Sequence, residues 1–402
     1  MQIVRKFSIL LIFGIILPGN LIAKKKKEKE EKEGYTFTLV KEIKTTPVKD
    51  QANTGTCWSY ATTSFLETEM LRLNKGEHDL AEMYFVRLIY PLKAQKYLRY
   101  HGLANFSEGG QGHDVTDVVR KFGIVPEEAY SGIKYDLDYH QHDELVSTLK
   151  GILDISLKNM SNYSGKSMEI FSATLDAYLG ATPDTFTYNG KSFTPHSFAK
   201  EMGINPENYI ELTSYQSYPY YKQIDLEIPD NWSHDRYYNL PIDELMQIVD
   251  YAFDNNHSVN WDGDVSSRGF SHSNGVAVVP ESDPKNMEDS ERAKWEELPI
   301  NEQVDMLYSF DKPIKEKVIT QELRQKTFDK YNTTDDHLMH LVGVANDQNK
   351  TKYYLTKNSW ADDSNDYGGY LYMSETYLRL NTTAIQVHVD AIPAEIKAKL
   401  GL

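Results

Sequence analysis

The sequence predicts an α+β fold in which helices come first along the chain and strands come last. Apolar residues recur at helical spacing in segments up to residue 255, whereas alternating apolar residues dominate after residue 340. Segregation of this kind favours α+β packing over a regular βαβ sheet. With 402 residues, of which 40% are hydrophobic, the chain is long enough to bury a core without disulfides or metal.

The first residues are expected to lie outside the folded body. Residues 1–23 combine a basic start, an apolar run and a small-residue end, which is the layout of a secretory signal peptide. Residues 24–34 mix both charges without an apolar face and indicate a solvated spacer. We therefore predict export to the periplasm or the exterior, and no stable membrane association after signal cleavage. The alternative is a chain anchored to the membrane by an uncleaved signal. The folded body is predicted to cover residues 35–402.

Three amphipathic helices are predicted in the first part of this body. They cover residues 57–73, 114–122 and 241–255, each with apolar residues at helical spacing. Residues 160–238 are rich in Tyr, Ser, Asn and Pro, and their weak periodicity supports no assignment. Residues 281–297 are charge-dense and are expected on the surface.

Strands dominate the end of the chain. Short apolar and aromatic runs between polar turns predict strands over 341–345, 353–360 and 369–373. Alternation over 385–389 predicts a fourth strand, and residues 391–402 favour a short helix. The strands follow the helices, as the α+β prediction requires.

Composition excludes one class of partner and leaves a single cysteine to explain. A net charge of −16 repels the phosphate backbone, so no nucleic-acid partner is expected. The single Cys57 can form neither an intramolecular disulfide nor a zinc cluster of thiolates. It lies at the N-terminal end of a predicted helix, a position that lowers the pKa of a thiol. Cys57 could therefore be a nucleophile or a small buried hydrophobic residue, and the residues around it must decide between the two.

Candidates for the other parts of a thiol-based site lie close before Cys57 and far after it. The Gln51 amide and the Cys57 N–H are expected to form an oxyanion hole. His337 is the expected general base, and it would share a proton with Cys57 as an imidazolium–thiolate pair. Asn358 is expected to hold the imidazole in one tautomer, with Trp360 shielding that hydrogen bond from water.

Three ordered motifs carry a resemblance to a known family. They are Q-x-x-x-G-x-C-W at 51–58, D-H-x-x-x-x-x-G at 336–343 and N-S-W at 358–360. With them the chain resembles the papain-like cysteine peptidases. Thr54 replaces the second cysteine of the classical enzymes, and the interval from Cys57 to His337 is 280 residues instead of about 130 to 150. Both departures are similar to the bleomycin hydrolase and aminopeptidase C branch.

The resemblance implies a papain-like two-lobed fold with an active cleft between the lobes. A helical lobe would carry Cys57, and a β-barrel-like lobe would carry His337 and Asn358, with a large insertion within about 130–300. It also implies an aminopeptidase that releases N-terminal residues from peptides through a Cys57 thioester, with no cofactor or metal. In that branch a C-terminal arm in the cleft limits access to free amino ends, and hexamers enclose the sites. A homo-hexamer is therefore an expectation, and peptides are the expected partners.

Other functions were weighed against this one. A papain-like endopeptidase and a catalytically inactive exported protein that binds peptides or glycans are the alternatives. His337 and His340 beside Asp335 and Asp336 resemble a set of metal ligands, but their i, i+3 spacing on a predicted strand matches no known metal motif. Retention of the full set of Gln, Cys, His and Asn favours catalysis.

Overall fold

The computed structural model describes residues 34–402 except 283, 287–291 and 293–294. The predicted signal peptide and residues 24–33 of the predicted spacer lie outside the described residues. Among the helices that are described, none is both long enough and apolar enough to cross a membrane.

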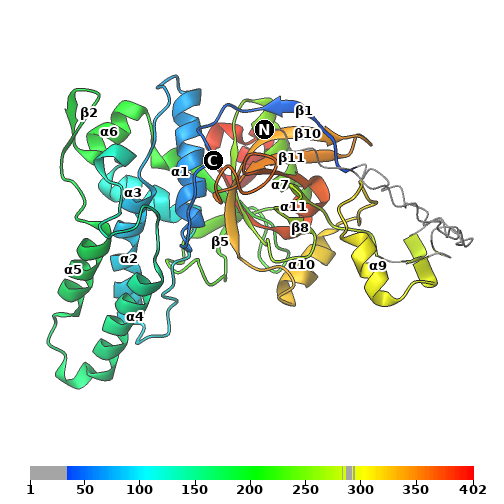
Figure 1. The fold of residues 1–402 in the computed structure, drawn as a ribbon. Helices are drawn as coiled ribbons and strands as arrows, with labels where there is room; N and C mark the ends of the chain where they lie inside the picture. Colours follow the sequence, from blue (N-terminus) through cyan, green and yellow to red (C-terminus); the bar gives the residue numbers. More distant parts are fainter. Residues whose placement is uncertain (1–33, 283, 287–291, 293–294) are drawn as a thin grey trace, which may run out of the picture. The chain divides into compact units, whose positions relative to one another are not determined.

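The first lobe is built from helices that follow one another along the chain (Figure 1). They are α1 (Cys57–Arg72), α2 (Glu82–Arg99), α3 (Gly112–Phe122), α4 (Asp143–Lys158), α5 (Ser167–Leu179) and α6 (Pro195–Met202). A small hairpin of β2 (Phe186–Tyr188) and β3 (Lys191–Phe193) precedes α6. Their buried side chains form one hydrophobic core that is shared by these helices.

The second lobe is an 11-stranded sheet with helices packed around it. The strands run in the order β5-β6-β4-β13-β7-β10-β11-β12-β9-β8, and β1 pairs with β10 beside this path. Their bounds are β1 (Phe37–Glu42), β4 (Tyr209–Thr213), β5 (Lys222–Asp225), β6 (Arg236–Asn239), β7 (Val259–Gly263), β8 (Phe270–Ser271), β9 (Val276–Ala277), β10 (His337–Asp347), β11 (Lys352–Lys357), β12 (Tyr370–Ser374) and β13 (Thr382–His388). The accompanying helices are α7 (Ile242–Asp254), α9 (Ile300–Leu307), α10 (Gln321–Asp329), α11 (Glu375–Asn381) and α12 (Ala394–Leu400).

Strand β10 is the centre of the sheet lobe and presents His337 at its first residue. Its first half pairs with β7, which places the Cα of His337 opposite that of Gly263. Its second half pairs with β1 on the same edge, while β11 occupies the other edge. The ladder with β7 holds the backbone at His337, and β11 joins the other edge of β10 from His340 onward.

Helix α1 lies between the two cores and is buried on all sides. Every residue from Cys57 to Met70 is buried, including the polar residues Ser59, Thr62 and Glu67. The predicted apolar positions do face a core, but α1 also packs against β10 and β7 with its polar side. Its polar groups are paired there: Asn260 Nδ2 donates to Thr62 Oγ1 at 2.8 Å. The predicted helix is thus confirmed, and its burial exceeds that of a surface helix.

Most predicted elements are confirmed with shifted ends, and some elements had not been predicted. The strand predicted over 353–360 ends at Lys357, because residues 358–360 turn into the site. Helix α2 escaped prediction because Pro91 lies inside it and its buried residues face several directions. The charge-dense segment 281–297 is only partly on the surface, since Glu281 and Trp295 are buried whereas Glu296 and Glu297 are exposed.

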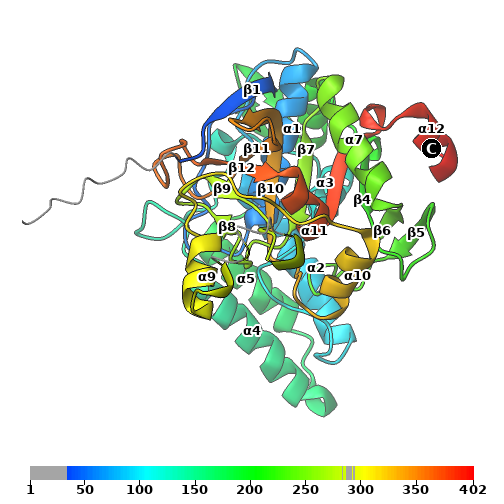
Figure 2. The ribbon, with the colours of Figure 1, turned by 90° about the vertical axis from the view of Figure 1, so that its right-hand side faces the viewer.

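The C-terminal residues form the predicted short helix, α12, on the outer side of the sheet lobe (Figure 2). Ile396 and Leu400 belong to the hydrophobic core of this lobe, and Gln247 Nε2 of α7 donates to Glu395 Oε1 at 3.0 Å. Strand β13 leads into this helix from His388, whose ring stacks on His257 near the last turn of α1. Cys57 is at the other end of α1, about 18 Å from Glu69 at 1.5 Å per residue. Leu402 therefore does not lie at Cys57.

Candidate active site

The loop before α1 is fitted closely against the segment Glu108–Gly110. The N–H of Gly55 donates to Glu108 Oε2 at 2.8 Å, and Trp58 Nε1 donates to the carbonyl oxygen of Glu108 at 2.9 Å. A Cβ on Gly55 would come 2.9 Å from the Glu108 Cβ, so this position has room only for glycine. These contacts explain why glycine is found two residues before the cysteine and tryptophan directly after it. They also fix the position of the first turn of α1.

Cys57 is the first residue of α1 and is 8% exposed. The first turn contains no acidic residue, so the partial positive charge of the helix N-terminus is not neutralised there. The thiol lies at β10, where it accepts a hydrogen bond from the backbone N–H of Leu338, the residue after His337. The structure therefore brings Cys57 and His337 together from opposite lobes.

His337 is the start of a chain of four hydrogen bonds that fixes its tautomer. Its Nε2–H donates to Asn358 Oδ1 at 2.8 Å, and Asn358 Nδ2–H donates to His272 Nδ1 at 3.3 Å. His272 Nε2–H donates to Ser364 Oγ at 2.8 Å, and that hydroxyl donates to the Ala361 carbonyl oxygen at 2.7 Å. The directions follow from the donors and acceptors that each group offers. They leave Nδ1 of His337 as the unprotonated, basic nitrogen.

His272 was not among the residues that the sequence suggested. It lies after the short strand β8, 65 residues before His337, and belongs to none of the motifs. Burial lowers the pKa of His272, which keeps its Nδ1 available as an acceptor. Its role is to orient the Asn358 amide so that the oxygen, and not the nitrogen, faces His337.

Trp360 covers the bond between His337 and Asn358, as predicted from the N-S-W motif. Its ring centroid lies 4.8 Å from that of His337 with an interplanar angle of 34°. The same indole meets the His272 ring edge-on at 4.9 Å. An apolar ring over both imidazoles excludes water that would compete for the Asn358 amide.

Burial favours the neutral forms of both Cys57 and His337 in this conformation. It raises the pKa of the Cys57 thiol to about 12, against the opposing hydrogen bond from Leu338. It lowers the pKa of His337 to about 4, against the opposing bond to Asn358. The resting thiolate–imidazolium pair expected from the sequence is thus disfavoured here, because desolvation outweighs the helix N-terminus. Cys57 Sγ and His337 Nδ1 hold one proton between them in the neutral pair and in the thiolate–imidazolium pair alike.

This proton state predicts how alkylation of Cys57 depends on pH. As the pH is lowered, the rate of alkylation by iodoacetamide should stay constant to well below pH 6.5. The reason is that His337 gains a second proton only near its lowered pKa of about 4. Below that value the rate should fall, because an imidazolium cannot accept the thiol proton. Mass spectrometry of samples quenched at successive times measures the alkylation rate from about pH 3 to about pH 9, with glutathione as the control thiol. An acid limb centred at or above pH 6.5 would contradict the assignment.

Gln51 is placed beside the same group of residues. Its N–H donates to the Ser359 carbonyl oxygen at 2.9 Å, and Ser359 Oγ donates to Gln51 Oε1 at 2.7 Å. With Oε1 fixed in this way, Nε2 donates one hydrogen to Thr54 O at 2.7 Å and has a second one to offer. The Cys57 N–H makes no backbone hydrogen bond within the described part of the chain. Two donors therefore remain for an oxyanion.

Two sets of side chains could be considered for a metal, and neither needs one. His337 and His340 do not act together, since His340 Nδ1 pairs with Ser64 Oγ of α1 at 2.9 Å. In the part of the chain that is described, one triad of potential ligands lies within 4.8 Å of one another: Glu69, His257 and His388. Its carboxylate is already neutralised by Arg72, which donates to both oxygens of Glu69.

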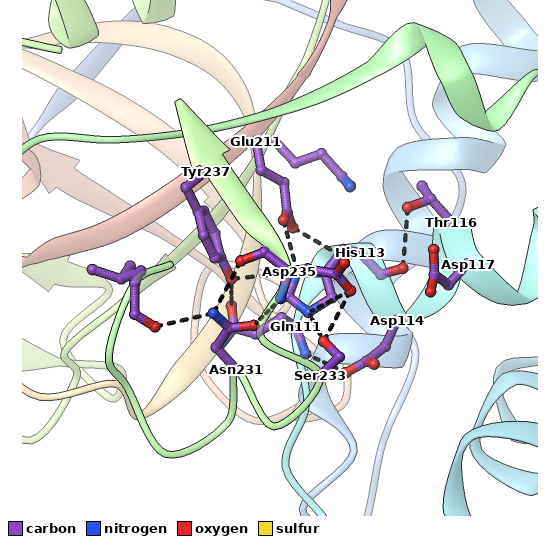
Figure 3. Close-up of polar contacts among 12 residues, drawn as sticks. Gln111, His113, Asp114, Thr116, Asp117, Glu211, Asn231, Ser233, Asp235 and Tyr237 are labelled. Carbon is purple, nitrogen blue, oxygen red and sulfur yellow. Dashed lines mark hydrogen bonds and ion pairs between the residues drawn. The ribbon is translucent and has the colours of Figure 1, made fainter. Parts of the chain in front are cut away.

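A second polar network joins the lobes next to the site (Figure 3). His113 at the start of α3 bonds Glu211 of β4 twice, with its N–H to Oε1 at 2.8 Å and its Nδ1 to Oε2 at 2.7 Å. Burial disfavours the protonated imidazolium of His113, but the Glu211 carboxylate stabilises it more strongly. The pKa of His113 is therefore raised to about 10. Its Nε2 faces the hydroxyl of Ser233 at 3.0 Å. This buried ion pair fixes the residues before β6 against the helical lobe.

Comparisons with known proteins agree with this geometry. The model of the Peptidase C1-like family matches residues 303–401, which include His337 and Asn358. Aminopeptidase W of Lactobacillus delbrueckii subsp. lactis is 22% identical over 389 residues, covering 90% of this chain and 84% of that protein. Aminopeptidase G of the same organism is 23% identical over 391 residues, covering 86% and 82%. Cysteine proteinase 1, mitochondrial, of Saccharomyces cerevisiae (strain YJM789) is 26% identical over 123 residues, which is 26% of each chain.

The crystal structure of PepW from Lactobacillus rhamnosis HN001 has the same fold. It matches with a TM-score of 0.70 at 18% identity and covers 90% of this chain and 84% of that one. The PepW match confirms the predicted fold, and the sequence matches agree with the resemblance to the papain-like cysteine peptidases that the motifs indicate. The two relatives that match over most of their length are, in particular, named aminopeptidases.

Proposed function

We propose that this protein is a cysteine-type aminopeptidase that releases N-terminal residues from peptides through a thioester on Cys57. The observation that carries the proposal is the hydrogen-bond chain from Ser364 to His337, since it leaves one basic nitrogen at the end of α1 where the thiol lies. The names of aminopeptidases W and G support the exopeptidase part.

The reaction follows from the positions of these groups. The Sγ–H proton of Cys57 passes to Nδ1 of His337 as the sulfur attacks the carbonyl carbon of the first peptide bond. The Gln51 amide and the Cys57 N–H stabilise the oxyanion that forms. His337 then protonates the departing amine, the C–N bond breaks, and the thioester remains. Water gives a proton to the same imidazole and attacks the thioester, which frees the amino acid and restores the thiol.

A pair of substrates tests the proposal and separates it from an endopeptidase. We expect an aminoacyl-coumarin amide with a free α-amino group to be cleaved at least about 100-fold faster, in kcat/KM, than its N-acetylated form, because a site built for a charged group rejects its neutral analogue. Fluorescence release measures both rates. Faster cleavage of the acetylated form would indicate an endopeptidase. Absence of cleavage combined with binding of a peptide or glycan would favour the inactive binding protein.

Location and assembly complete the proposal. Export through residues 1–23 would place the enzyme outside the cytoplasm, where peptides are available as substrates. A homo-hexamer that encloses the sites is supported by the resemblance to the bleomycin hydrolase branch.

A further inference from the structure

Three aspartates lie beside the thiol and take no part in the reaction steps above. The charges of Asp230, Asp262 and Asp335 act on Cys57. They come from the loop before β6, from strand β7 and from the segment that leads into β10. Carboxylates next to a nucleophilic sulfur oppose formation of a thiolate, so their presence requires another explanation.

Asp262 is the most deeply buried of the three aspartates. It is 3% exposed, and its Cα lies opposite that of Leu338 in the ladder between β7 and β10. Asn260, two residues earlier on the same face of β7, contacts Thr62 of α1, so Asp262 also points toward α1 between the lobes. In the described part of the chain, neither carboxylate oxygen of Asp262 accepts a hydrogen bond from a donor. Buried carboxylates ordinarily have such donors.

The polar neighbour of Asp262 is a second carboxyl group, that of Asp335. Both oxygens of Asp335 accept from Gln111 Nε2 at 3.1 Å, and the Asp230 N–H donates to the same carboxylate. Burial, together with the charge of Asp335, raises the pKa of Asp262 well above its ordinary value. Burial, together with the charge of Asp230, raises that of Asp335 to about 7. One proton shared between Asp262 and Asp335 therefore leaves one negative charge on the pair.

The third aspartate, Asp230, has a cation close to it. Asp230 faces the field of Lys93, a fully buried ammonium, and accepts from Asn105 Nδ2 at 3.0 Å. The largest electrostatic influences on Asp262 and Asp335 are those of other carboxylates. Asp230 and Asp335 are partly exposed whereas Asp262 is buried, so the group opens to solvent on one side. A site with one unmatched negative charge suits a single positive charge.

We propose that Asp262 and Asp335, with Asp230 at the rim, bind the α-ammonium group of the peptide substrate. This inference rests on the proposed aminopeptidase function. In the first residue of a peptide the α-nitrogen is only two bonds from the carbonyl carbon that Cys57 attacks, so its receptor must lie beside the sulfur. Leu402 is held with α12 on the far side of the sheet lobe and does not supply that charge.

A metal ion fits the three aspartates less well than an ammonium group. The ligand atoms of a bound ion converge on one point, and within the described residues only Glu69, His257 and His388 meet within 4.8 Å. The three aspartates come from three separate segments, and among the described residues their oxygens do not converge in this way. An α-ammonium with three N–H donors matches such separate acceptors.

The test compares Asp262→Asn and Asp335→Asn in the full chain, with Asp250→Asn as the matched control. Asp250 lies on α7, where it pairs with Lys352, and the same chemical change there should leave both substrates unaffected. In each test variant we expect kcat/KM for the free-amine coumarin amide to fall about 100-fold, mainly through a higher KM. Cleavage of the N-acetylated amide should stay close to its wild-type rate, and alkylation of Cys57 by iodoacetamide should not fall below its wild-type rate, because loss of a nearby carboxylate favours the thiolate.

The outcomes distinguish this inference from the proposed function. If the wild-type enzyme prefers the free amine and both variants keep that preference, the aminopeptidase function stands and the ammonium receptor is wrong. If the variants lose both substrates and the alkylation rate equally, the aspartates serve only the fold, and the receptor is again wrong. If the wild-type enzyme cleaves neither substrate, the proposed function itself fails. If added Ca²⁺ or Mg²⁺ stimulates cleavage by the wild-type enzyme but not by the variants, the aspartates bind a metal ion and the ammonium receptor is wrong.

Discussion

Replacement of Cys57 by alanine is expected to lower kcat/KM for the free-amine substrate by at least about 10⁴-fold, because Cys57 is the single thiol of the chain. The unfolding temperature should change by no more than a few degrees. Alanine keeps the helical backbone and removes one sulfur atom, for which about 1 kcal/mol of stability is a reasonable cost. Fluorogenic cleavage and thermal unfolding measure the two effects.

Cys57→Ser is the matched control for this experiment. The hydroxyl is similar in size but is a far weaker nucleophile, so the serine variant should be as inactive as the alanine variant and fold equally well. Its unfolding curve shows what the loss of sulfur alone does to the fold. Turnover by either variant above the background would refute the thioester mechanism.

The second large effect is expected for Gln51→Ala, which should reduce kcat by about 10²- to 10³-fold with little change in KM. The amide is proposed to bind the oxyanion, which exists only after the sulfur has attacked. Steady-state kinetics of the free-amine substrate separates the two constants. A rise in KM at unchanged kcat would show that Gln51 binds the ground state instead.

Ser359→Ala is the control that separates chemistry from support of the loop. It removes the hydrogen bond from Ser359 Oγ to Gln51 Oε1 and leaves the amide donors of Gln51 in place. We expect a loss in kcat of less than about tenfold, the value of one neutral hydrogen bond. Equal losses in the two variants would mean that Gln51 only holds the loop before α1.

The fold class and the residues of the candidate site could both be predicted from the sequence, but only the fold is confirmed. Cys57, Gln51, His337 and Asn358 lie in short motifs whose chemistry depends on local geometry, and the structure brings their segments together. The same holds for Trp360, since a ring two residues after the asparagine reaches the imidazole that the asparagine binds. Their catalytic roles stay predictions until the variants are measured.

Residues that act only through tertiary contacts could not be found in the sequence. His272 meets Asn358 because β8 and β9 extend the sheet beside β12, a pairing that no local pattern shows. Asp262 reads as one polar residue in a short strand, and only the ladder with β10 places it near Cys57. The ends of α1 were predicted, but its burial was not, because its polar residues suggested a solvent face.

The burial of α1 has a consequence for the whole molecule. Helix α1 adds its apolar side chains to the hydrophobic core of the helical lobe and packs its polar side against β7 and β10 of the sheet lobe, so both lobes use it as a wall. The lobes are therefore not independent folding units, although each has its own hydrophobic centre. Since Cys57 lies on this helix and His337 lies on the strand that packs against it, a chain that has not finished folding has not yet brought these two side chains together.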